Sequence, residues 1–291
     1  MLVAMLRNPP MWACAAAAGV YWWGNRAPIR VPSTVSAALR ERRRLAVFFG
    51  AGLLVIIGSL SVPMDNLSDH WFWVHMTQHL LLAVVAAPLI VMGAPWLAPW
   101  RLIGHRARVT LTRTIGHGRA WAPLRRVLRP LTRPLGAWLA FNVTLLGWHL
   151  PVLYDLTLRN AGIHDLEHGL LLLTAVLFWA QILESSPMRV RLSEPQQVAY
   201  LTMATIAGWV LALALSLPST PIYQAYADQH HGDSATSAVT DQQLAAGMMW
   251  VPGSIPYSIG VLVVLYRWLD ERPSGSSRRL GSRRGMVEEP R

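Results

Sequence analysis

The sequence predicts an all-α polytopic membrane protein, a bundle of seven transmembrane helices with its N-terminus outside and its C-terminus in the cytoplasm. Hydrophobic side chains make up 53% of the 291 residues, and charged residues only 14%, against about 25% in soluble proteins. The apolar residues form blocks long enough to cross a bilayer, which takes about 20 helical residues. The basic residues alternate from one connection to the next. These three observations predict the fold class.

Seven apolar blocks are visible along the chain. Glycine and proline interrupt several of them, which membrane helices tolerate where neighbouring groups satisfy the freed backbone. The blocks are Pro10–Trp23, Leu45–Val62, Phe72–Leu97, Leu135–Leu150, Ile163–Leu183, Val198–Leu217 and Leu244–Trp268.

The first block is the shortest, because Arg7, Asn8 and two prolines precede its apolar core. A cleavable signal peptide is the alternative interpretation, since Ala15–Ala18 are small. A signal peptide carries its basic region before the apolar core, whereas here the basic run follows it. We therefore expect a retained helix.

The arginines fix the orientation. All 26 basic residues are arginine, and all but Arg7 and Arg159 lie in the connections after blocks one, three and five or at the C-terminal end. Basic loops stay in the cytoplasm, which places the C-terminal end there. We expect residues 1–271 to form the transmembrane domain and residues 272–291 to form an arginine-rich, disordered cytoplasmic tail. The sequence pI near 11 therefore reports membrane topology and not nucleic-acid binding. The basic loop at 101–133 is expected to contact anionic headgroups of the lipid bilayer.

Two histidine pairs are the most informative local feature. His75 and His79, like His164 and His168, are four residues apart, which places both rings of a pair on one helix face. The predicted topology brings both pairs to the outer side. Ionisable residues in spans are functional candidates, and histidine is the commonest metal ligand. We therefore predict that these four histidines form a metal site.

Other donors are predicted at the same depth. His149, Met248 and Met249 would be supplementary or transfer ligands, and thioethers shift the preference of a site towards Cu(I). Acceptors would hold the imidazole tautomers through their free N–H groups. Of the remaining histidines, His105 and His117 fall on the cytoplasmic side, and the three others on the outer side are better interpreted as interfacial residues. The predicted acceptors are Gln78, Asp165 and Glu167, and the interfacial histidines are His70, His230 and His231.

Other functions remain open from the residues alone. His164-Asp-Leu-Glu-His168 matches the H-x-x-E-H zinc motif of some metalloproteases, in which the glutamate is the general base. That pattern is short, and no third carboxylate ligand is evident. Histidines on facing helices can also ligate haem, although pairs one turn apart suit a compact metal centre better. A scaffold that binds no metal is the remaining alternative. The lone Cys14 excludes an internal disulfide and cysteine-based metal motifs.

Several spaced motifs over about residues 40–270 resemble the CtaG-like family of bacterial cytochrome c oxidase assembly factors. The first helix and the tail carry no such signal, and Phe178-Trp179 is followed by Ala-Gln rather than by a proline-containing turn. The motifs are Val62-Pro-Met-Asp-Asn-Leu-Ser-Asp69, His75-Met-Thr-Gln-His79-Leu-Leu-Leu, Trp148-His-Leu-Pro-Val-Leu-Tyr-Asp155, His164-Asp-Leu-Glu-His168, Phe178-Trp179, Pro221-Ile-Tyr223, Asp241-Gln-Gln-Leu and Met248-Met-Trp-Val-Pro-Gly253.

The resemblance implies a multi-pass protein of the bacterial plasma membrane that helps to mature a haem–copper cytochrome c oxidase. Family members are associated with copper delivery, which makes copper the expected metal, ahead of zinc or haem. The implied partners are oxidase subunits. The implied role is assembly with no established reaction, so we do not expect an enzyme. Ligation needs neutral imidazole, so metal affinity should fall below about pH 6.5.

Overall fold

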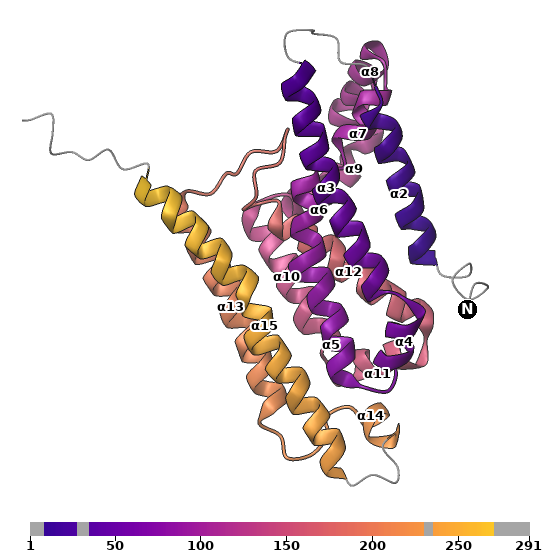
Figure 1. The fold of residues 1–291 in the computed structure, drawn as a ribbon, viewed down its shortest axis with the longest axis vertical. Helices are drawn as coiled ribbons and strands as arrows, with labels where there is room; N and C mark the ends of the chain where they lie inside the picture. The colour runs from indigo at the N-terminus through magenta and orange to yellow at the C-terminus, as the bar shows by residue number, and fades with distance from the viewer. Residues whose placement is uncertain (1–8, 28–34, 230–234, 271–291) are drawn as a thin grey trace, which may run out of the picture.

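The computed structural model describes residues 9–27, 35–229 and 235–270, and these residues form a helical bundle (Figure 1). Apart from one isolated bridge between Ser185 and Met188, its regular elements in these ranges are helices. They are α2 (Pro9–Asn25), α3 (Val35–Ser59), α4 (Val62–Ser68), α5 (Phe72–Leu80), η2 (Leu81–Ala86), α6 (Ala87–Gly93), α7 (Leu97–Leu102), α8 (His105–His117), η3 (Arg119–Trp121), α9 (Ala122–Leu131), α10 (Pro134–Trp148), α11 (Pro151–Arg159), α12 (Ala161–Trp179), α13 (Glu194–Ser216), α14 (Gln224–Gln229) and α15 (Ala235–Asp270).

Four helices in the described residues are long and apolar enough to cross a membrane, and the number rises to six if each of two bent pairs is one span. The four are Phe72–Leu102, Ala161–Trp179, Glu194–Ser216 and Ala238–Asp270. The first predicted block forms α2, a helix of 17 residues. The predicted tail lies outside the described residues. The protein is therefore an all-helical, multi-pass membrane protein with four to six candidate spans.

Each of the two bent helix pairs has a short break between its helices. Helices α3 and α4 meet at 50°, and α10 and α11 at 73°. Leu150 is extended at the second break, and Pro151 begins α11. Proline disfavours helical backbone in the residue before it, which accounts for the break. His149 lies at this corner as the C-cap residue that follows α10.

The span that begins with α5 contains a π-helical stretch, η2, directly after the first histidine pair. In π-helical register the carbonyl of Ala83 faces residue 88, but Pro88 has no N–H to donate. The indole Nε1 of Trp179 on α12 donates to that carbonyl instead, over 2.9 Å. This hydrogen bond joins α12 to the span that begins with α5.

Helices α13 and α15 lie side by side as a long pair against the remaining bundle (Figure 1). The buried carboxylate of Asp241 on α15 accepts hydrogen bonds from the backbone N–H groups of Phe72 (2.8 Å) and Trp73 (3.0 Å). These N–H groups open α5 and have no partner within their helix. The last helix therefore caps the helix that carries His75 and His79.

The arginine-rich connection at 101–133 forms helices where we expected a loop. Helices α8, η3 and α9 contain no buried residue, and α9 carries Arg125, Arg126 and Arg129 beside Leu124 and Leu128. Short helices with separate basic and apolar residues are typical of segments that lie in the membrane interface.

Candidate metal centre

The two predicted histidine pairs lie together in the structure. The ring centroids of His75 and His164 are 5.0 Å apart, those of His75 and His168 5.5 Å, and those of His79 and His168 5.2 Å. Because each pair spans about one helical turn, α5 and α12 each present two rings towards the other helix. His75, His79 and His168 are buried, and His164 is half-buried.

The donor atoms of these side chains converge. The Nε2 atoms of His75 and His79 are 3.0 Å apart. Ligand atoms of His75, His79 and His168 all lie within 4.8 Å of one another, and so do those of His75, His164 and Glu167. Metal–nitrogen bonds of about 2.0–2.1 Å place ligand atoms roughly 3–4 Å apart, so small side-chain movements would bring these atoms into range of one ion. Both groups are therefore able to hold a metal ion.

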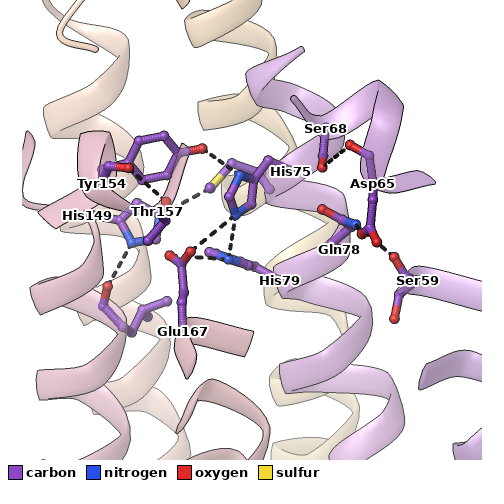
Figure 2. Close-up of polar contacts among 12 residues, drawn as sticks. Ser59, Asp65, Ser68, His75, Gln78, His79, His149, Tyr154, Thr157 and Glu167 are labelled. Atoms are coloured by element: carbon purple, nitrogen blue, oxygen red, sulfur yellow. Dashed lines mark hydrogen bonds and ion pairs between the residues drawn. The ribbon is translucent and has the colours of Figure 1, made fainter. Parts of the chain in front are cut away.

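Glu167 is fully buried against the first histidine pair (Figure 2). Its Oε2 lies 3.6 Å from Nε2 of His75, and its Oε1 lies 3.5 Å from Nε2 of His79. The sequence prediction gave Glu167 a supporting role as an acceptor of imidazole N–H groups. The structure instead places it among the ring nitrogens, where a carboxylate is a potential ligand.

Several donor atoms of this cluster have no hydrogen-bond partner among the described residues. A buried polar atom left unpaired costs about 1–3 kcal/mol, and a cation would compensate several such atoms at once. The atoms are Nδ1 of His79, Nε2 of His164, Nε2 of His168 and both carboxylate oxygens of Glu167.

A chain of hydroxyl groups fixes the orientation of His75. Nδ1 of His75 lies 2.9 Å from the Tyr154 hydroxyl, which lies 3.2 Å from the Tyr226 hydroxyl, and the latter donates to the carbonyl of Ser68 over 2.7 Å. The Ser68 carbonyl only accepts, so the arrangement that places one hydrogen in every contact runs from His75 Nδ1–H through both tyrosines. Nε2 of His75 then keeps its lone pair and faces the cluster.

Tyr226, on α14 outside the candidate spans, remains a phenol at neutral pH. Burial, which disfavours the phenolate, is the main reason that its pKa lies well above the usual value of 10. Tyr226 therefore retains the hydrogen that it donates to Ser68. This chain ties the orientation of His75 to an outer connection of the bundle.

The other predicted acceptors lie away from the cluster. Gln78 is buried on another face of α5 and donates from Nε2 to the Ser59 carbonyl and to Asp65, both over 2.8 Å (Figure 2). This amide ties α5 to α3 and α4. Asp165 is exposed and lines a groove of about 650 Å³ that His168 also lines.

The predicted supplementary ligands divide into two groups. His149 is buried, with its ring centroid 5.9 Å from that of His79, and Met249 lines the same cavity as these two histidines. Met248 is half-buried and does not line that cavity. Sequence reasoning missed Met76, whose sulfur is 3.1 Å from Nε2 of His149. Its place inside the His75–His79 motif was the available signal.

The remaining histidines do not join the cluster. His70 is exposed and bonds through Nδ1 to the Asn66 carbonyl over 2.8 Å. His105 and His117 are exposed at the two ends of α8. His230 and His231 lie outside the described residues.

A family model described as "Cytochrome c oxidase caa3 assembly factor (Caa3_CtaG)" matches residues 19–271. An uncharacterized protein of Mycobacterium bovis and one of Mycobacterium tuberculosis are each 23% identical to the chain over 247 residues, which is 80% of this chain and 36% of each relative. The chain thus spans about a third of the length of these relatives. No solved structure matches it.

Proposed function

Because the chain belongs to the cytochrome c oxidase caa3 assembly factor family (Caa3_CtaG), we propose that it helps to assemble a haem–copper oxidase by holding copper between α5 and α12. The observation that carries this proposal is the convergence of His75, His79 and His168, whose ligand atoms lie within 4.8 Å of one another. His164 and Glu167 complete the proposed site. The client would be a subunit of the oxidase.

The chemistry of the donors supports a transition metal. Imidazole suits copper, zinc, iron and nickel, whereas carboxylate alone favours harder cations. Among these metals we favour copper, since copper is a constituent of haem–copper oxidases and is bound there as an ion rather than within a porphyrin. Burial would shield the bound ion from water and from competing ligands until a client exchanges it.

The proposed topology is seven spans in a bacterial plasma membrane, with the N-terminus outside. Helix α2 would be the additional span beside the six candidates, although its 17 residues are near the lower limit for crossing a bilayer. The arginine-rich helices α8 and α9 would lie at the cytoplasmic surface. The histidine cluster, at the other end of the spans, would then face the side on which an outward copper centre is built.

We propose a carrier and not an enzyme. The alternative with a specific observation behind it is a zinc-dependent hydrolase, because Glu167 lies beside His164 on the helix that carries the H-x-x-E-H motif. Hydrolysis requires a water molecule and a substrate at the metal, and fully buried donors such as His75 and Glu167 suit storage better than turnover.

Copper stoichiometry tests the proposal. The full chain, purified in lipid nanodiscs and loaded with copper, is compared with His75→Ala, His168→Ala and the matched control His70→Ala, which makes the same change at an exposed histidine. We expect copper in the wild type and the control, and a lower copper content in the other two variants. Equal copper in all four proteins would overturn the proposed site. Bound zinc with a hydrolytic activity lost in Glu167→Gln would establish the alternative.

A further inference from the structure

We propose a second metal site beside the histidine–carboxylate cluster, formed by Nε2 of His149 and the thioether sulfur of Met76 and selective for Cu(I). The two atoms lie 3.1 Å apart and come from α5 and from the corner between α10 and α11. The inference rests on the proposed function for the identity of its metal. It extends that function with a softer site of different chemistry.

The hydrogen bond from His149 to the backbone identifies the tautomer of its imidazole ring. Nδ1 of His149 lies 2.7 Å from the backbone carbonyl of Leu145. A carbonyl oxygen only accepts, so the hydrogen of this bond belongs to Nδ1. In a neutral imidazole the other nitrogen, Nε2, is then unprotonated and presents its lone pair.

The partner of that lone pair has no hydrogen to offer. The thioether sulfur of Met76 is itself a weak acceptor, and Met76 is fully buried. Two electron-rich atoms thus face each other at 3.1 Å without a hydrogen between them. A protonated Nε2 would carry a buried positive charge opposite a weak acceptor, which is costly. A soft cation that bonds to both atoms resolves this contact.

The cavity beside Met76 and His149 contains a further potential donor, the thioether of Met249. Met76, His79, His149 and Met249 line one small cavity of about 40 Å³ between α5, α10, α13 and α15. Its remaining lining is largely apolar, with Phe141 and Tyr257 among the larger side chains. A thioether is a flexible ligand with three rotatable bonds, so its sulfur has room to adjust around an ion.

The donor set defines the ligand class. Thioether sulfur with imidazole and no carboxylate favours a soft monovalent ion such as Cu(I) over Zn(II). His79 contributes to the primary cluster and also lines this cavity, so the two sites adjoin. Passage of Cu(I) from one site to the other would be a ligand exchange without a change of oxidation state.

X-ray absorption at the copper edge tests the inference, because it distinguishes sulfur from nitrogen and oxygen neighbours. The full chain in nanodiscs is loaded with Cu(I) under anaerobic reducing conditions, as wild type, as Met76→Leu and as the control Met92→Leu, which removes a thioether from the same span outside the cavity. Leucine approximates the volume of methionine, which is the kind of core change tolerated best.

We expect a sulfur neighbour of copper in the wild type and in Met92→Leu, and its loss in Met76→Leu together with about one ion of Cu(I) capacity per chain. Should Met76→Leu not fold, wild-type protein labelled with selenomethionine must show a selenium neighbour instead. An unchanged sulfur signal in Met76→Leu, or only nitrogen and oxygen neighbours in the wild type, would overturn the site.

His168→Ala separates this inference from the proposed function. Loss of copper from the primary cluster with retention of the sulfur signal supports two sites. If His168→Ala and His75→Ala bind as much copper as the wild type while Met76→Leu loses the sulfur signal, the primary site is wrong and the thioether site stands.

Discussion

The Nε2 atoms of His75 and His79 lie 3.0 Å apart, and each lies 3.5–3.6 Å from an oxygen of Glu167. At most one hydrogen fits between the two nitrogens. The hydroxyl chain from Tyr154 leaves the lone pair of His75 on Nε2, so electron-rich atoms from two helices face a common point. Four experiments probe what this point binds.

Glu167→Gln should weaken the binding of divalent metal by about tenfold or more, while binding of Cu(I) changes less. The substitution preserves shape but removes the negative charge closest to both histidines, and the loss scales with the charge of the ion. Competition with chromophoric chelators measures both affinities. Glu184→Gln, at an exposed glutamate on the far end of the bundle, is the control; equal losses for both ions would contradict the charge argument.

Tyr154→Phe should lower metal affinity by about 10–100-fold, the range found when a hydrogen-bond partner of a metal-binding histidine is removed. Phenylalanine retains the packing of the ring but leaves Nδ1 of His75 without its acceptor. Tyr200→Phe removes a hydroxyl that lies 3.4 Å from the Phe178 carbonyl, away from the cluster, and should leave the affinity unchanged. Metal titration of both variants under the same conditions measures the two affinities.

Asp241→Ala should lower the free energy of unfolding by about 0.5–2 kcal/mol, the usual cost of losing a helix cap. The backbone N–H groups of Phe72 and Trp73 lose their acceptor, and the first turn of α5 then frays near His75. Thermal unfolding in detergent measures the stability, and metal titration measures the effect on the cluster. Asp228→Ala, at an exposed aspartate of α14, provides a second acidic site for comparison. Full metal affinity in Asp241→Ala would show that the cap does not position the histidines.

Metal affinity should fall as the pH decreases. Protons and metal compete for the same imidazole lone pairs, and each histidine that must lose a proton weakens apparent binding by up to about tenfold per pH unit below its pKa. The metal affinity is therefore expected to be higher at about pH 7.5 than at about pH 5.5. Titrations at the two pH values with the same metal measure the change. Affinity that is independent of pH over this range would argue against imidazole ligands.

The sequence predicted the central cluster because two regular rules apply to it. Helical periodicity joins His75 to His79 and His164 to His168, and the distribution of arginine assigns both pairs to one membrane side. The family suggested by the spaced motifs is confirmed, as is the all-helical membrane fold. The count of seven spans and the orientation remain predictions.

Contacts between different helices could not be predicted from the sequence. No periodicity indicates that Asp241, 169 residues after Phe72, caps α5, or that Tyr226 completes the hydrogen-bond chain of His75. The position of Glu167 beside the ring nitrogens of His75 and His79 was not predicted, because spacing along α12 does not reveal which acidic side chain faces α5. Met76 was missed for a related reason: its sulfur acquires a partner only through the corner that Pro151 imposes between α10 and α11.

The cap from α15 to α5 also bears on the order of events during synthesis. A nascent chain inserted up to α12 already carries all four histidines, yet the start of α5 still lacks the carboxylate that holds it. Asp241 is translated more than 70 residues after His168, and it reaches α5 only once the final helix has entered the bilayer. The first turn of α5 therefore gains these hydrogen bonds only after the last helix has been translated and has packed against it.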